Sequence, residues 1–452
     1  MRPRQPAHSA VIGKQRSQIA TGPAKSKRPV RLGRGFWVLC AGAFINRAGT
    51  MVVPFMTLYL VSARGFPVVV AGETLAGFGG GALVAPLIGG ALADRVGRRV
   101  TLLGGTLATA AIMVALAYAR LTALIVVLIF LLGVTLEAPR PVTQALVADL
   151  VPEEDRARAY AALFWVSNLG FAAAMTGAGF LAQSAFTAIF WIDAATGLLF
   201  GGLVWLFVPE RSRRLDAVRK SPSGYRLVMR DRTMLAFTAA VLVYYFVYLQ
   251  ADSTLPLAVH RSGLAPHVYG LCMALNGVVI CLAQPILAPR LIRRDHGRVW
   301  AAGVALVGVG FALTAIASTT GGYLLSVAVW TFGEIFPATV TGAIVARLAP
   351  EALRGRYSGL YSLAVASGWL TSSLGGTQLL SVSPLVLWGS CAVLSAASAY
   401  GVLRLAPRLG PVKPERSKQD GSSSPDAAET RGRWSWRSAA PTKLRPSRRL
   451  GA

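Results

Sequence analysis

Charged residues are scarce in this sequence, and acidic residues are the scarcest of them. Of 452 residues, 14% are charged and only 19 are Asp or Glu, whereas 54% are hydrophobic. A soluble domain does not bury so large an apolar share, so the composition excludes a single soluble core and indicates a membrane protein with several spans. The fold class that we expect is all-α.

Cysteine and histidine are also rare, with four of each. The cysteines lie in apolar stretches and lack the spacing of a disulfide framework or metal site (Cys40, Cys272, Cys281, Cys391). The histidines fall in tails or loops, which argues against a histidine proton relay (His8, His260, His267, His296). The sequence shows neither a G-x-x-x-x-G-K-[ST] phosphate loop nor a nucleophile–base pair. We therefore expect no enzyme, no ATP-driven work, no cofactor and no metal.

Long apolar runs are abundant instead. Stretches of about 20 apolar residues predict twelve transmembrane helices. Their expected centres are Arg47, Gly80, Thr109, Val134, Ala172, Leu198, Phe246, Val279, Phe311, Glu334, Ser367 and Val393.

The basic residues predict the orientation of these spans. The net charge is +27, and nearly all of the 46 Lys and Arg residues fall in the two tails and the even-to-odd loops. The exceptions are Arg47 and Arg140 within spans, and Arg64, Arg120 and Arg261 on the other side. This asymmetry predicts that both termini are cytoplasmic. It also explains the basicity through topology and contact with anionic lipids, so nucleic acid is not an expected partner.

The same pattern gives a domain organisation. We expect a disordered basic N-terminal tail (1–35), a six-helix bundle (36–208) and a polar cytoplasmic linker (209–233). A second six-helix bundle (234–405) and a disordered basic C-terminal tail (406–452) should follow. Arg far outnumbers Lys among the basic residues, which is typical of a GC-rich bacterial genome. The expected location is therefore a bacterial inner membrane.

The two expected bundles carry an internal repeat. Residues 139–158 recur without a gap at 337–356, identical at eleven of twenty positions and offset by 198 residues. The match indicates a duplicated unit of about 200 residues. Because each repeat holds six spans, the two repeats should have the same orientation in the membrane. In a membrane chain such duplication is typical of transporters, whose substrate site forms between two halves.

The loop between the second and third spans carries a motif. It reads Gly90-Ala-Leu-Ala-Asp94-Arg95-Val-Gly97-Arg98-Arg99. This pattern resembles the signature loop of the major facilitator superfamily. The resemblance implies a fold of two six-helix repeats, and it implies that Asp94 closes the cytoplasmic side by contacting the eleventh span. There Gly355 and Arg356 are the candidate partners. A static ion pair at the end of a helix is the alternative interpretation.

Other stretches resemble the proton-coupled multidrug antiporters of that superfamily. They are Asn46-Arg47-Ala-Gly49 in span 1 and Trp330-Thr331-Phe-Gly333-Glu334 in span 10. The resemblance implies efflux of small hydrophobic or cationic compounds by a monomer. Span 5 departs from the pattern, because Ala174-Met175 stand where that group has Gly-Pro. Uptake by proton symport or facilitated diffusion is therefore one alternative, and a non-transporting receptor on the same scaffold is another.

Four ionisable side chains lie near the middle of predicted spans: Arg47, Glu137, Arg140 and Glu334. Charge inside a bilayer is costly and marks a candidate functional site, here for proton coupling. With the repeat offset of 198 residues, Glu137 corresponds to position 335, which is one residue from Glu334. Fixed ion pairs that hold the bundle together are the alternative. For Asp193, Asp252 and Glu73, nearer the outer ends where water can reach, we expect structural roles.

Aromatic and amide side chains on the expected inner faces predict the substrate cavity. The candidates are Asn46, Tyr244, Tyr248, Gln250, Asn276, Trp330 and Phe336. Flat or cationic ligands suit such rings through stacking and cation–π contact. Simple packing or lipid contact of these rings is the alternative. The expected partners are a small-molecule substrate, protons and membrane lipids.

Overall fold

The computed structural model describes residues 33–152, 155–208, 227–350 and 353–409, and nearly all of them are helical. The helices of the first half are α1 (Arg34–Gly49), α2 (Val52–Leu58), the π-helix η1 (Tyr59–Ala63), α3 (Val68–Val96), α4 (Arg98–Tyr118), α5 (Thr122–Glu137), α6 (Pro139–Leu150), α7 (Arg156–Leu181) and α8 (Phe186–Phe207). Those of the second half are α10 (Arg232–Tyr248), α11 (Gln250–Ser253), α12 (Leu255–Arg261), α13 (Pro266–Leu291), α14 (His296–Thr314), α15 (Thr320–Leu348), α16 (Arg354–Val382) and α17 (Pro384–Leu409).

These helices form the twelve predicted spans, because each expected centre falls in a different long helix. Ten helical stretches of the described residues are long and apolar enough to cross a membrane. The fourth span is α5, which continues beyond Ala138 as α6. The eleventh is α16, whose 29 residues are long enough but rich in Gly and Ser. The prediction of an all-α fold with twelve transmembrane helices in two repeats is confirmed.

Some boundaries differ from the predicted ones. Helix α10 begins at Arg232, inside the expected linker, and α17 continues to Leu409. Most of that linker and of both expected tails lies outside the described residues. Three histidines expected in loops lie in helices instead: His260 in α12, His267 in α13 and His296 in α14. Each is near a helix end, where the sequence pattern fixes boundaries least well.

The two helices at matching positions of the repeat, spans 1 and 7, are both interrupted. Span 1 breaks at Thr50 and Met51, between α1 and α2, and span 7 breaks at Leu249 and again at Thr254. With the 198-residue offset, Met51 corresponds to Leu249. Proline contributes to both interruptions, since Pro54 and Pro256 have no N–H for the carbonyl four residues earlier.

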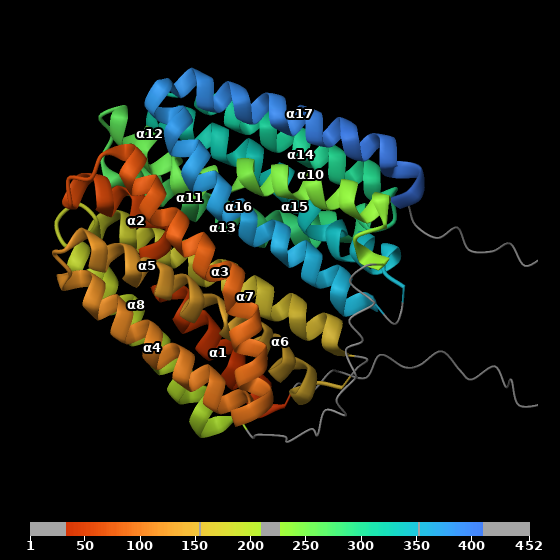
Figure 1. Cartoon of the computed structure of the whole chain (residues 1–452), viewed down its shortest axis with the longest axis horizontal. Coiled ribbons are helices and arrows are strands. Elements are labelled where there is room, and N and C mark those ends of the chain that lie inside the picture. Colours follow the sequence, from red (N-terminus) through yellow and green to blue (C-terminus); the bar gives the residue numbers. More distant parts are fainter. Residues whose placement is uncertain (1–32, 153–154, 209–226, 351–352, 410–452) are drawn as a thin grey trace, which may run out of the picture. The chain divides into compact units, whose positions relative to one another are not determined.

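Close packing joins the halves along two seams. Helix α3 packs on α16, and α7 packs on α13. A Cβ added at Gly79 would lie 2.5 Å from the backbone N of Leu370, and one at Gly270 would lie 2.4 Å from the carbonyl O of Met175. Only glycine allows these helices to approach so closely. Elsewhere α14 lies beside α17, and α4 beside α8 (Figure 1).

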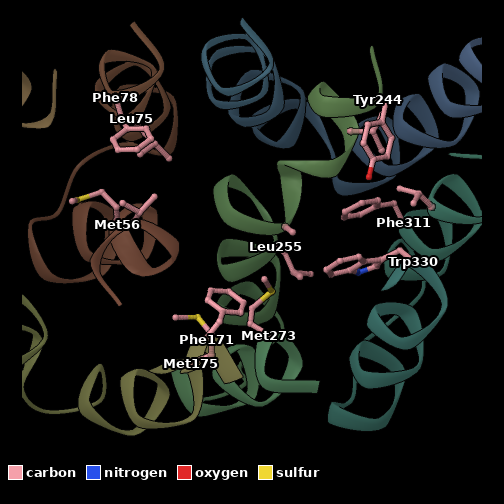
Figure 2. Packing of buried hydrophobic residues seen from close by; sticks show 14 of the residues in the cluster. Met56, Leu75, Phe78, Phe171, Met175, Tyr244, Leu255, Met273, Phe311 and Trp330 are labelled. Atoms are coloured by element: carbon pink, nitrogen blue, oxygen red, sulfur yellow. The ribbon is translucent and has the colours of Figure 1, made fainter. Parts of the chain in front are cut away.

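We call the end of the bundle at which α1 begins and α17 ends the inner end, and the opposite end the outer end. Near the inner end, a Cβ added at Gly90 of α3, or at Gly355 or Gly359 of α16, would meet nothing within 4 Å. One hydrophobic cluster contains side chains of both halves, and Figure 2 shows Phe171 of α7 beside Met273 of α13. A smaller cluster, with Phe36 and Val142, lies within the first half. The halves are therefore packed together at the outer end, whereas these three glycines near the inner end have open space beside them.

Candidate substrate cavity and coupling residues

A cavity of about 530 Å³ lies in the second half, with one wall residue, Phe164, from α7. Its lining extends from Glu334, in the middle of α15, to Ala349 and Arg354 at the inner end. At 1.5 Å per residue, the fifteen residues from Glu334 to Ala349 span roughly 22 Å. The cavity therefore leads from the middle of the bundle to its inner end.

Glu334 is held by uncharged donors. The Tyr248 hydroxyl donates to Oε1 at 2.7 Å, and Asn276 Nδ2 donates to Oε2 at 2.8 Å. Asn276 is itself positioned by Thr331, whose Oγ1 lies 3.1 Å from the same Nδ2. Among the described residues, no Lys, Arg or His nitrogen lies within 4.0 Å of this carboxylate. Neutral donors therefore orient both carboxylate oxygens of a side chain that lines the cavity.

Six aromatic rings line the cavity: Phe164, Tyr244, Tyr245, Tyr248, Trp300 and Tyr361. Tyr244 stacks on Tyr248 with ring centroids 5.7 Å apart, and Trp300 meets Tyr244 edge-on at 5.8 Å. The Tyr245 and Tyr361 hydroxyls lie 3.1 Å apart. Glu334 is the only acidic residue that lines the cavity within the described chain. Rings around a single carboxylate can bind a flat or cationic ligand.

A second group of charged residues lies at the break in span 1. The buried carboxylate of Asp193, from α8, accepts hydrogen bonds from the Met51 and Val52 backbone N–H groups, both at 3.2 Å. Arg47 lies in the last turn of α1, and its guanidinium carbon is 4.7 Å from the centre of the Phe171 ring. It is within electrostatic range of Asp193. These two hydrogen bonds agree with the structural role expected of Asp193, which stays a prediction, but the expected access of water is wrong, because Asp193 is 5% exposed.

Replacing Asp193 with alanine should destabilise the fold. Two backbone donors inside the bundle would then lose their acceptor, at a cost of about 1–3 kcal/mol. Thermal unfolding of the purified protein in detergent measures the effect. Glu73→Ala, an exposed acid on α3, is the matched control and should leave the melting temperature unchanged. Equal melting curves for Asp193→Ala and wild type would contradict this role.

Of the predicted cavity residues, Tyr244 and Tyr248 line the cavity. Asn276 does not line it but donates a hydrogen bond to Glu334, which does. Trp330 is fully buried behind the wall, where its ring stacks on Phe311 (Figure 2). Gln250 is also buried and bonded to Ser253 and Thr254. Phe336 packs against the core, and Asn46 provides the carbonyl that accepts the Thr50 hydroxyl. These last four residues are absent from the cavity lining.

Of the predicted coupling residues whose side chains the structure describes, only Glu334 lines the cavity. Glu334 lines the cavity, whereas the half-buried Glu137 ends α5 and does not. Arg47 lies at the break in span 1, away from the lining. Arg140 is in α6, and its side chain lies outside what the structure describes. Most of the other lining residues were missed, among them Trp300, Arg354 and Tyr361, since the sequence contains no signal for which face of spans 9 and 11 turns inward.

The predicted gate motif joins α3 to α4 at the inner end. Gly97 separates these helices and has φ +91°, a conformation that favours glycine, so the turn needs this residue type. The Arg99 guanidinium lies 4.9 Å above the Trp205 ring. Asp94 is in α3, but its side chain is not among those described. The remaining motif residues follow their helices: Gly90 and Arg95 in α3, Arg98 in α4 and the partner Arg356 in α16.

Comparisons with known proteins agree with this architecture. The sequence model of the "Major Facilitator Superfamily" matches residues 39–373 and 237–446. The "Uncharacterized MFS-type transporter YttB" of Bacillus subtilis is 25% identical over 401 residues, which cover 86% of this chain and 100% of that protein. A "Na(+), Li(+), K(+)/H(+) antiporter" of Planococcus maritimus is 24% identical, and the match covers 71% of this chain and 83% of that protein.

A "Multidrug resistance protein MdtH" of Cronobacter sakazakii is 26% identical, and the match covers 72% of this chain and 83% of that protein. Among solved structures, a peptide transporter, POT, in complex with sulfate is similar in fold, with a TM-score of 0.68 and 17% identity. That match covers 83% of this chain and 95% of the other. The chain belongs to the Major Facilitator Superfamily of membrane transporters.

Proposed function

We propose that this transporter exports small hydrophobic or cationic compounds in exchange for protons across a bacterial inner membrane. The observation that carries the proposal is the single acid, Glu334, among the aromatic rings of the cavity. The carboxylate attracts a cationic substrate, and its protonation releases that substrate. One site that binds either a proton or a cation gives exchange. Two relatives, named as a cation/proton antiporter and as multidrug resistance proteins, support this proposal.

Alternating access between the two halves would provide the transport step. The seams packed at the outer end and the cavity that leads to the inner end correspond to one of the two required states. With both termini cytoplasmic, as the basic residues predict, this is the inward-facing state. In the other state, we propose, Asp94 contacts α16 near Arg356 and closes the inner end.

Uptake by proton symport is the second candidate, and one feature favours it. Helix α7 runs unbroken from Arg156 to Leu181, without the Gly-Pro pair that antiporters of this group carry in span 5. Everted membrane vesicles separate the two directions. During respiration, an exporter should concentrate ethidium in the acidified lumen, whereas a symporter should carry it out with protons. Loss of the pH gradient on adding Na⁺ or K⁺ would favour exchange of an inorganic cation instead.

Tyr248→Phe should shift the pH dependence of transport without abolishing it. The substitution keeps the ring stacked on Tyr244 but removes a hydrogen bond to the Glu334 carboxylate. A charged carboxylate that loses a donor is protonated more readily, so the midpoint should move to higher pH by about one unit. The initial rate of ethidium transport from pH 5.5 to 9 measures the shift. Tyr245→Phe, whose hydroxyl meets Tyr361, is the matched control.

A further inference from the structure

Thr331 fixes the side chain that binds one oxygen of the Glu334 carboxylate. The Thr331 hydroxyl donates its only hydrogen to the Val327 carbonyl at 2.6 Å, so its oxygen accepts from Asn276 Nδ2, 3.1 Å away. The other hydrogen of the same amide nitrogen goes to Glu334 Oε2 at 2.8 Å. Both hydrogens of the Asn276 amide are therefore used, and the side chain faces the carboxylate as a donor.

The surroundings of Asn276 keep its amide in this orientation. The next residue, Gly277, packs on α7 of the other half, where an added Cβ would lie 2.9 Å from the Asn168 carbonyl O. Asn276 and Thr331 are both buried, so their hydrogen bonds are sheltered from water. A turn of the amide would present its oxygen to Thr331, whose hydrogen is already bonded. The amide therefore keeps its nitrogen toward the carboxylate.

The two carboxylate oxygens consequently differ in how they can take up a proton. A hydrogen on Oε2 would point at the N–H group of Asn276, so two donors would face each other. A hydrogen on Oε1 would point at the Tyr248 oxygen, and a phenol hydroxyl can accept as well as donate. Tyr248 lines the cavity, so its own hydrogen can turn toward water or substrate there. Protonation on Oε1 therefore sacrifices fewer hydrogen bonds than protonation on Oε2.

We propose that Glu334 takes up its proton on Oε1 and that Thr331, acting through Asn276, is the positioning residue that sets this choice. Hydronium in the cavity gives one proton to Oε1 and becomes water, while the Tyr248 hydroxyl changes from donor to acceptor. The Tyr248 hydrogen then points into the cavity. A neutral carboxyl and a hydroxyl hydrogen aimed at the ligand both disfavour a cation, which agrees with release of the substrate on protonation. The inference rests on the proposed proton coupling at Glu334.

Other titratable groups surround this carboxylate as well. Tyr244 of α10 and Asp252 of α11 are within electrostatic range of Glu334, and Arg354 of α16 lines the same cavity nearer its inner end. All three are the same in every variant of the test. A difference between the variants therefore reports the hydrogen bonds to the carboxylate.

Infrared difference spectra between pH 5 and pH 9 identify the oxygen that carries the proton. The sample is the purified protein in lipid nanodiscs, and the carboxyl C=O band that is absent from Glu334→Gln belongs to Glu334. With the proton on Oε1, the C=O oxygen is Oε2, which accepts from Asn276. Asn276→Leu should therefore move the band to higher wavenumber, and Tyr248→Phe should move it much less. A shift in Tyr248→Phe that equals or exceeds the shift in Asn276→Leu would overturn this inference alone.

The pH dependence of ethidium transport gives a second measurement, which does not depend on the folding of Asn276→Leu. Thr331→Val keeps the size of the side chain but removes the oxygen that holds the amide, so the amide can turn and accept from a protonated carboxyl. The midpoint should then rise by about one pH unit, whereas Thr331→Ser should keep the wild-type midpoint. An unchanged midpoint in Thr331→Val would overturn the positioning role. The absence of any Glu334 band from the wild-type spectrum would overturn the proposed proton coupling, and this inference with it.

Discussion

Glu334→Gln is expected to abolish proton-driven transport, with the initial rate falling at least hundredfold. Glutamine keeps the size of the side chain and can still accept the Tyr248 hydrogen bond, so the cavity should keep its shape. It cannot exchange a proton or carry the negative charge that attracts a cation. Purified protein in liposomes with an imposed pH gradient and ethidium as the probe measures the rate.

Two controls separate coupling from a loss of folding. Glu137→Gln alters the acid at the matching position of the other repeat, which does not line the cavity, and should keep more than half of the activity. The melting temperature of purified Glu334→Gln should match that of wild type. If Glu137→Gln were inactive and Glu334→Gln active, the coupling acid would lie in the first half instead.

The twelve spans could be predicted because a membrane helix needs about 20 apolar residues, whatever it packs against. Composition alone would have been less reliable for α16, where Gly and Ser lower the hydropathy. These small residues contact α3 of the other half, as Gly72 meets Thr377. The prolines Pro54 and Pro256 were visible in the sequence, but the interruptions that accompany them depend on partners such as Asp193, whose position only the fold gives.

The cavity could be predicted only in part, because the sequence does not determine how each helix is rotated. Glu137 and Glu334 are nearly equivalent in the repeat, yet only Glu334 faces the lining. Tyr244 and Tyr248 were recognised from their four-residue spacing on one helix face. Trp330 lies on the same helix as Glu334 but turns toward Phe311, on which its ring stacks.

Gly270→Leu is expected to reduce transport more than tenfold by separating the outer ends of α7 and α13. A Cβ at this position would lie 2.4 Å from the Met175 carbonyl O and 2.8 Å from the Gly179 Cα. Both contacts are backbone, so no rotamer change relieves them, and overpacking of this kind costs about 1–3 kcal/mol. The substitution therefore raises the free energy of the state in which the outer end is closed, but not that of the state in which it is open.

The matched control is Gly389→Leu in α17, where an added Cβ meets nothing within 4 Å. It should transport like wild type, which excludes an effect of leucine on insertion or expression. Double electron–electron resonance between spin labels at Arg120→Cys and Ser318→Cys, two exposed outer-end positions in opposite halves, should give a longer distance in Gly270→Leu than in wild type. If that variant instead kept the wild-type distance and rate, close contact between α7 and α13 would not be needed for closure. Closure would then depend on the seam between α3 and α16 and on the contact between the interrupted helices α2 and α11.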